Sequence, residues 1–357
     1  MVGEYKGCGA FSYPIMGCPY MKSNVFVIRR LVYMIPVLFG VMLGVFFTVR
    51  LIPGDPIRVI LAGRHVTQEV REEMQRDLGL DKPWYVQYWI WCANVVRGDL
   101  GRTIRSRRPV LDEISCKFPH TIELVSFSLL LAIPLGFGLG MLAALKPNSI
   151  FDYLATTLSV IGVSMPAFWL GLLMLLLFSI YLGWLPTSGL VSIKVGLKPI
   201  THFYVLDALL QRNLPALGSF LFHMIMPSMV LATIPLAYIT RMVKSSMLDV
   251  LQEEYINTAR SKGLIEVKVV FKHALRNAVI PVTIMIGTIT GLLLGGAILT
   301  ETIFGLPGMG TLMVGAILER DFPLIQGSIL VFAVSYNIVT LLTDVACQII
   351  DPRASYG

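Results

Sequence analysis

The feature that most constrains the fold of this chain is a series of apolar runs, each 18 residues long or longer. A helix needs about 20 apolar residues to cross roughly 30 Å of hydrocarbon, so these runs predict membrane-spanning helices. They lack the period-two alternation that is typical of membrane β-barrel strands. Only 14% of the residues are charged, whereas soluble domains carry about a quarter. We therefore predict an all-α polytopic membrane protein.

The apolar runs predict six transmembrane helices. They cover about residues 31–49, 122–145, 154–182, 222–242, 279–300 and 325–349. Lys and Arg gather before the first run and in the 241–277 loop, and cytoplasmic loops carry this excess, so both termini are expected in the cytoplasm. The same rule explains the net charge of +7. No basic stripe accompanies a nucleic-acid-binding motif, so nucleic acid is not expected as a partner.

The segments between and beyond these helices complete the predicted organisation. They are a disordered extension over 1–20, a first helix within 21–49, an extracytoplasmic helical loop over 50–118, a helical core over 119–349 and a cytoplasmic tail over 350–357. In the long loop, one helix is expected from Thr67, and a second is expected in the aromatic-rich stretch WYVQYWIWCANVV. These two helices lie either on the outer leaflet or as a small subdomain against the spans. Cys92 and Cys116 share this loop, and two free thiols are expected more often than a disulfide.

Several motifs of catalysis and energy conversion are missing from the sequence. There is no GxxxxGK[ST] phosphate loop, no HExxH zinc pair and no GxSxG elbow, so no catalytic residue, metal or cofactor is assigned to this chain. The predicted spans hold few ionisable residues away from their ends. Ion-coupled secondary transporters usually need such residues, so this class of protein is less favoured. A membrane-anchored scaffold stays open as another class. An active transporter of this composition would need an external source of energy.

One face of the predicted fifth span carries Gly287, Gly291 and Gly295 at intervals of four residues. Small residues at this spacing allow two membrane helices to approach closely. The stripe therefore indicates helix packing, with a lining role in a central passage as the alternative.

The loop between the fourth and fifth spans reads EYINTARSKGLIEVKVVFKHALRNAVIP from residue 254. Apolar positions from Met247 to Ala259 fall on one face of a helix that is expected to run from Ser245 to Gly263. A second short helix is expected over 266–277. From the residues alone, this pair of helices suits either a lipid surface or a protein partner.

TARSKG followed by KHALRNAVIP resembles the cytoplasmic signature of permease subunits in binding-protein-dependent ABC importers, in the dipeptide and oligopeptide branch. In that family a loop of pattern EAA, three residues and Gly forms the coupling helix. Asn257, Thr258 and Ala259 occupy the EAA positions before Gly263, with Asn257 in place of the glutamate. The resemblance continues through LIPGDP, GDLG, SMPAFW, GWLPTSG, RMVKSSMLDVL and AILTETIFGLPGMG.

This resemblance implies the permease fold of type I ABC importers and a set of partners. They are a homologous second permease, two cytoplasmic ATPases that bind ATP and Mg, and an extracytoplasmic peptide-binding protein. The residues implied in ATPase coupling are Tyr255, Asn257, Thr258, Ala259, Lys262, Gly263, His273 and Arg276. Those implied in docking of the binding protein are Glu301, Thr302, Gly305 and Pro307. Dipeptides are the expected substrates, and glutathione, nickel chelates or haem are alternatives for the same type of importer.

Overall fold

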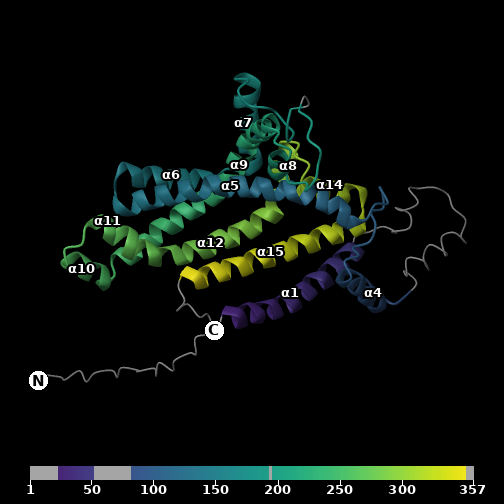
Figure 1. The fold of residues 1–357 in the computed structure, drawn as a ribbon, viewed down its shortest axis with the longest axis horizontal. Coiled ribbons are helices and arrows are strands. Elements are labelled where there is room, and N and C mark those ends of the chain that lie inside the picture. Colours follow the sequence, from purple (N-terminus) through teal and green to yellow (C-terminus); the bar gives the residue numbers. More distant parts are fainter. Residues whose placement is uncertain (1–22, 52–81, 193–194, 351–357) are drawn as a thin grey trace, which may run out of the picture.

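A computed structural model describes residues 23–51, 82–192 and 195–350 and places most of them in helices (Figure 1). In these ranges there is no β-strand, and the one isolated bridge joins Arg102 to Pro109. The all-α fold class predicted from the sequence is confirmed. The predictions for residues 1–20, for the helix at Thr67 and for the tail after Ile350 lie outside the described residues.

Five segments of the described chain are long and apolar enough to cross a membrane. They correspond to α1 (Ser23–Leu51), α5 (Val110–Leu145), α9 (Leu214–Leu251), α12 (Leu275–Gly296) and α15 (Phe322–Ile350). The helices lie side by side in an elongated bundle with α1 along one edge (Figure 1). At 1.5 Å per residue the 38 residues of α9 span about 57 Å, so this helix extends beyond any bilayer core.

The predicted third span is not a straight helix. It consists of α6 (Ile150–Ser164), α7 (Ala167–Met174) and a π-helix, η1 (Leu175–Tyr181), with a bend of 101° between α6 and the rest. Counted as one span, the bent pair brings the total to six. Pro166 explains the bend, because the residue before a proline is disfavoured in a helix, and Met165 is extended with φ −82° and ψ 124°.

The centre of the bundle is the close packing of α5 against α9. A Cβ atom on Gly140 of α5 would lie only 2.7 Å from the carbonyl oxygen of Thr240, and one on Gly136 would lie 2.7 Å from Ile239 Cγ2. The two glycines therefore let the backbones approach where larger residues would hold them apart. Buried residues of α9 and α12, among them Met247 and Val282, continue this core.

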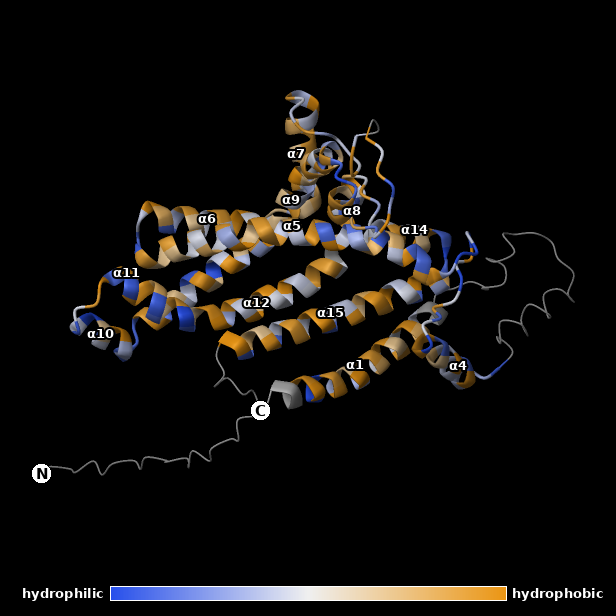
Figure 2. Cartoon of the chain, viewed as in Figure 1, coloured by the Kyte–Doolittle hydropathy of each residue, from blue (hydrophilic) through white to orange (hydrophobic). Residues whose placement is uncertain are grey.

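Short elements separate the long apolar helices at the two ends of the bundle. One end carries the elbow (residues 254–274), which comprises α10 (Glu254–Ser261), α11 (Glu266–Lys268) and a π-helix, η2 (Val269–Ala274). The other end carries α4 (Trp84–Val96), α8 (Tyr204–Leu210), α13 (Ile298–Ile303) and α14 (Met309–Glu319). Figure 2 shows hydrophilic residues gathered at these ends and hydrophobic ones along the long helices.

The aromatic helix α4 packs on the first span by one face. The hydroxyl of Tyr88 donates to the carbonyl oxygen of Phe39 at 3.2 Å, and the Tyr88 ring is buried against Phe46. Trp84 and Trp89 also contact Phe47 and Phe39 of α1 with their rings, yet they remain 54% and 61% exposed. The helix thus contacts α1 while it keeps aromatic surface outward. Among the described cysteines, Cys92 and Cys116 are free thiols.

Candidate functional site

The elbow begins with a break in the helix that the sequence predicts as continuous from Ser245. Helix α9 ends at Leu251, and Glu253 is extended before α10 starts, so the apolar face from Met247 to Ala259 is shared by two helices. The break lets α10 leave the direction of α9 and lay its own apolar side on the core. The elbow is therefore attached at the end of α9 and, through α11 and η2, at the start of α12.

Helix α10 presents one buried and one exposed face. Ile256 and Ala259 are buried in the same cluster as Val269 and Val270 of η2. Asn257 and Thr258 are exposed on the opposite side, and Tyr255 and Lys262 are exposed as well. Ala259 was expected to touch an ATPase, but it is only 8% exposed, so its side chain stabilises the elbow from within.

Gly263 ends α10 with a left-handed residue, at φ +76°. Its N–H donates to the carbonyl oxygen of Arg260 at 2.9 Å, and the N–H of Leu264 donates to that of Ala259 at 3.4 Å. This is the Schellman arrangement, in which glycine is favoured because a Cβ atom strains the left-handed conformation. No described atom lies within 4 Å of a Cβ built on Gly263, so the backbone conformation, not space, requires the glycine.

Two polar contacts hold the elbow in shape. The guanidinium of Arg260 donates to both carboxylate oxygens of Glu266, at 2.7 and 3.2 Å, which joins α10 to α11 across the glycine. The side-chain amide of Asn277 donates to the hydroxyl of Tyr255 at 2.7 Å, which joins α10 to α12. The sequence predicted Tyr255 as a coupling residue, but it gave no signal that Asn277 is its partner, because 22 residues separate them.

His273 and Arg276 lie beside this contact but do not take part in it. His273 is half-buried in η2, and Arg276 is exposed on the first turn of α12. Both are close in sequence to Asn277. The predicted set therefore covers the segment that contacts α10, but it omits Asn277, which makes the hydrogen bond to Tyr255.

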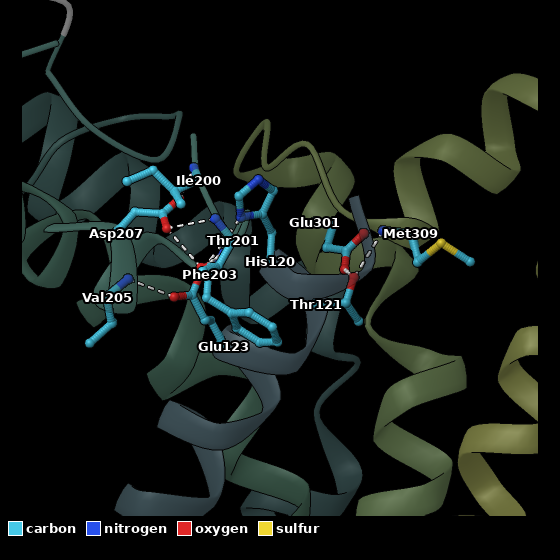
Figure 3. Close-up of polar contacts among 10 residues, drawn as sticks. All are labelled: His120, Thr121, Glu123, Ile200, Thr201, Phe203, Val205, Asp207, Glu301 and Met309. Carbon is cyan, nitrogen blue, oxygen red and sulfur yellow. Dashed lines mark hydrogen bonds and ion pairs between the residues drawn. The ribbon is translucent and has the colours of Figure 1, made fainter. Parts of the chain in front are cut away.

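At the opposite end, Glu301 of α13 is buried, with 1% of its surface exposed. One carboxylate oxygen accepts from the Thr121 hydroxyl at 2.6 Å (Figure 3). The other accepts from the N–H groups of Gly310 at 2.7 Å and Thr311 at 3.2 Å. Burial raises the pKa of Glu301, and these hydrogen bonds act in the opposite direction. The carboxylate of Glu301 is thus enclosed and holds the turn that follows it, and the predicted role of this residue in docking stays a prediction.

The glutamate turn (residues 301–311) fits tightly around this carboxylate. The hydroxyl of Thr121 also accepts from the N–H of Met309 at 2.9 Å (Figure 3). A Cβ atom on Gly308 would overlap the Glu301 carboxylate, and one on Gly310 would lie 2.5 Å from Ile298 Cα. Close packing therefore explains the second and third glycines of GLPGMG, Gly308 and Gly310.

Three of the residues predicted for docking remain accessible on this turn. Thr302 and Gly305 are exposed, and Pro307 is half-buried. Gly305 is left-handed, at φ +59°.

Helix α5 holds a second buried carboxylate two residues after Thr121. Glu123 accepts from the N–H of Val205 at 2.8 Å, and its other oxygen lies 3.6 Å from Nδ1 of His120 (Figure 3). Asp207 of α8 accepts from the N–H groups of Ile200 and Thr201 in the loop before that helix, at 3.0 and 2.8 Å. These contacts fix α8 on α5. Neither acid was predicted as a structural contact: Glu123 is 82 residues from Val205, and Asp207 binds backbone groups, which leave no pattern in the sequence.

Burial alone would raise the pKa of Asp207, but its hydrogen bonds from residues 200–202 outweigh burial and lower the pKa. The carboxylate is therefore held in its charged form within the loop.

The glycine stripe of α12 faces α15 over most of its length. A Cβ atom on Gly287 would overlap Thr343, and one on Gly291 would overlap the ring of Tyr336. No described atom lies within 4 Å of a Cβ on Gly295. Two of the three glycines thus permit close helix packing inside this chain, and the third borders open space.

The chain matches two families of known proteins. Residues 136–356 match the "Binding-protein-dependent transport system inner membrane component" family, and residues 23–125 match the related N-terminal family, "Binding-prot-dependent transport system membrane comp, N-term".

Curated relatives cover almost the whole chain. It is 44% identical over 328 residues to the di/tripeptide transport system permease protein DppB of Pseudomonas aeruginosa, a match that covers 92% of this chain and 98% of the relative. It is 43% identical over 331 residues to the dipeptide transport system permease protein DppB of Escherichia coli K12, with the same two coverages. The glutathione transport system permease protein GsiC of Escherichia coli K12 is 40% identical over 331 residues, covering 93% of this chain and 99% of that protein.

Proposed function

Because the chain belongs to the family of binding-protein-dependent transport system inner membrane components, we propose that it is a membrane subunit through which dipeptides and other short peptides enter the cytoplasm. The observation that carries the proposal is the 44% identity to a di/tripeptide permease over nearly the full length of both chains. Glutathione is a tripeptide, and the 40% identity to a glutathione permease makes it a second candidate substrate.

The subunit acts without a catalytic site of its own. The sequence contains no phosphate-binding loop, so ATP and Mg bind to two separate ATPase subunits. A homologous second permease completes the passage, and a peptide-binding protein delivers the substrate from outside the cell. Membership of a family named for its dependence on a binding protein supports this set of partners.

We place the elbow on the cytoplasmic side of the bacterial inner membrane. The start of α1, the end of α15 and the elbow share one end of the bundle (Figure 1), and the 241–277 loop carries an excess of Lys and Arg. Cytoplasmic loops carry this excess, so both termini are cytoplasmic as well. Thr302, Gly305 and Pro307 are then on the extracytoplasmic side, where a binding protein docks.

Coupling is proposed to pass through α10. Its exposed residues Asn257, Thr258 and Lys262 contact an ATPase, while Ile256 and Ala259 fix it to the core. Gly263 keeps the orientation of α10. A displacement of α10 then reaches α12 through the hydrogen bond from Asn277 to Tyr255, and α12 packs on α15 at Gly287 and Gly291. Such a packed chain of contacts can convert ATPase closure into a change of helix packing.

Uptake measurements test the proposal. Cells with and without the gene are given a labelled dipeptide, a tripeptide and glutathione at equal concentration, and the chain is also purified to identify bound proteins. We expect gene-dependent uptake of the dipeptide and copurification of ATPase subunits. Gene-dependent uptake of none of these compounds, or isolation of the chain without any ATPase, would contradict the proposal.

A further inference from the structure

A cavity of about 260 Å³ lies between α6 and α9, away from the elbow surface and the glutamate turn. It is lined among others by Ala155, Ser159 and Val160 of α6 and by Thr240, Arg241 and Lys244 of α9. No function described above uses it. Its two cations and its helical walls make it a candidate binding site.

The cavity lies where the charged and uncharged parts of both helices meet. Residues 214–240 of α9 contain no charged side chain, and Arg241 is the first. In α6, Asp152 is the last charged residue before the uncharged stretch 153–193. Because charged residues mark the ends of membrane spans, Asp152 and Arg241 indicate the same membrane–water boundary. The cavity therefore starts at the boundary and extends toward the hydrocarbon.

The walls of the cavity offer apolar surface and few free polar groups. The hydroxyl of Ser159 donates to the carbonyl oxygen of Ala155, and that of Thr240 donates to the carbonyl oxygen of Leu236, both at 2.7 Å. Val160 is 51% exposed at the cavity edge. A ligand that fills this space must therefore bring an apolar segment, because the walls cannot replace the hydration of a polar one.

The charged side chains at the edge of the cavity differ in whether they have a partner within the chain. Lys244 pairs with Asp152, which also accepts from the N–H of Asn148 at 3.1 Å. Arg241 is exposed and makes no hydrogen bond or ion pair with any described residue. The three side chains together carry one net positive charge. An unpaired guanidinium at a membrane boundary attracts an anion, and arginine binds phosphate through two parallel hydrogen bonds.

We propose that this cavity binds one anionic phospholipid, with its phosphate between Arg241 and Lys244 and an acyl chain between α6 and α9. A single lipid molecule satisfies the free guanidinium and fills the apolar space at once. A free phosphate ion would use only the cations, and a transported peptide would bring a polar backbone to walls that cannot hydrogen-bond it.

The test counts lipids that stay bound. The full chain is reconstituted in vesicles of phosphatidylethanolamine with or without phosphatidylglycerol, extracted in mild detergent and examined by native mass spectrometry. We expect one retained phosphatidylglycerol, a loss of at least threefold in Arg241→Gln, and a similar loss in Val160→Phe, which fills the cavity without a change of charge. The matched controls are Lys272→Gln, an exposed cation of the elbow, and Val163→Phe, an exposed residue of α6 outside the lining.

Two results would overturn the proposal. One is equal retention in Val160→Phe and Val163→Phe, which would place any lipid elsewhere on the surface. The other is equal retention of phosphatidylethanolamine and phosphatidylglycerol. Addition of a dipeptide or of inorganic phosphate provides a third arm, since displacement of the lipid by either would assign the cavity to that ligand. Peptide uptake is measured separately, so failure of this proposal is distinguishable from failure of the transport function.

Discussion

The two ends of the bundle interrupt the apolar helices with polar residues, but they use them in opposite ways. The elbow buries Ile256 and Ala259 and leaves Asn257 and Thr258 exposed. The glutamate turn buries its carboxylate and satisfies it within the chain. The comparison teaches that a polar interruption in a membrane protein has two explanations, a surface for a partner or an internal clamp. The number and source of the hydrogen-bond donors distinguish them.

The largest effect is expected from removal of the clamp. Glu301→Ala leaves the Thr121 hydroxyl and the N–H groups of Gly310 and Thr311 buried without their acceptor. Each such group costs about 1–3 kcal/mol, so we expect a loss of at least about 3 kcal/mol in the free energy of unfolding. The measurement is thermal or SDS-induced unfolding of the purified protein.

The matched control for Glu301→Ala is Thr302→Ala, at the next and exposed position. Glu301→Gln should be intermediate, because the amide retains one acceptor oxygen. Equal stability of the Glu301 and Thr302 alanine variants would remove the distinction between the two ends.

A smaller effect on stability and a large one on transport are expected at Gly263. Gly263→Val forces a β-branched residue into a left-handed conformation, at a cost of about 1–3 kcal/mol, and reorients α10. We expect the protein to reach the membrane while peptide uptake is lost and ATP hydrolysis by the assembled importer continues. Gly263→Asn, which tolerates this conformation, should retain most uptake. Normal uptake by Gly263→Val would contradict the coupling role of the elbow.

A moderate effect is expected at the contact between α10 and α12. Tyr255→Phe and Asn277→Ala each remove the same 2.7 Å hydrogen bond, so we expect each to lower uptake several-fold and the double variant to be no worse than the stronger single one. The double-mutant cycle in uptake rate is the measurement. Strictly additive losses would show that the two residues act through different contacts.

The smallest effect is expected from two cysteine substitutions, which test on which side of the membrane each end of the bundle lies. Thr302→Cys and Thr258→Cys replace exposed threonines at opposite ends of the bundle. A membrane-impermeant thiol reagent added to intact cells should label Thr302→Cys, and it should label Thr258→Cys only after permeabilisation. Labelling is read against the unsubstituted chain. The reverse pattern would invert the proposed orientation.

Features that depend on local composition, such as the long apolar helices, were predicted from the sequence. Features that depend on contacts between distant residues were not. Hydropathy indicated the fold class and the positions of the long helices, because each span is a local run. The bend at Pro166 was missed, since the apolar run over 154–182 continues through the proline and hydropathy does not indicate the direction of a helix. The burial of Glu301 was missed because its partner Thr121 lies 180 residues away.

At the elbow, local patterns predicted which side chain is buried and where the helix ends. Periodicity placed Ala259 on the apolar face of a helix, but the family resemblance assigned it to the contact with the ATPase. The structure follows the periodicity. Gly263 was identified correctly as the end of a helix, because a glycine after basic residues is a local signal.

The glycines that bring α5 and α9 together have a mechanical consequence. With Gly136 and Gly140 removing the side chains between them, the two backbones interlock against Ile239 and Thr240 and resist sliding or rotation. We therefore expect α5 and α9 to move together as one rigid unit. If the elbow moves as proposed, we expect the parts that pack on this pair to move against it, namely the bent α6–α7 segment and α12 with α15.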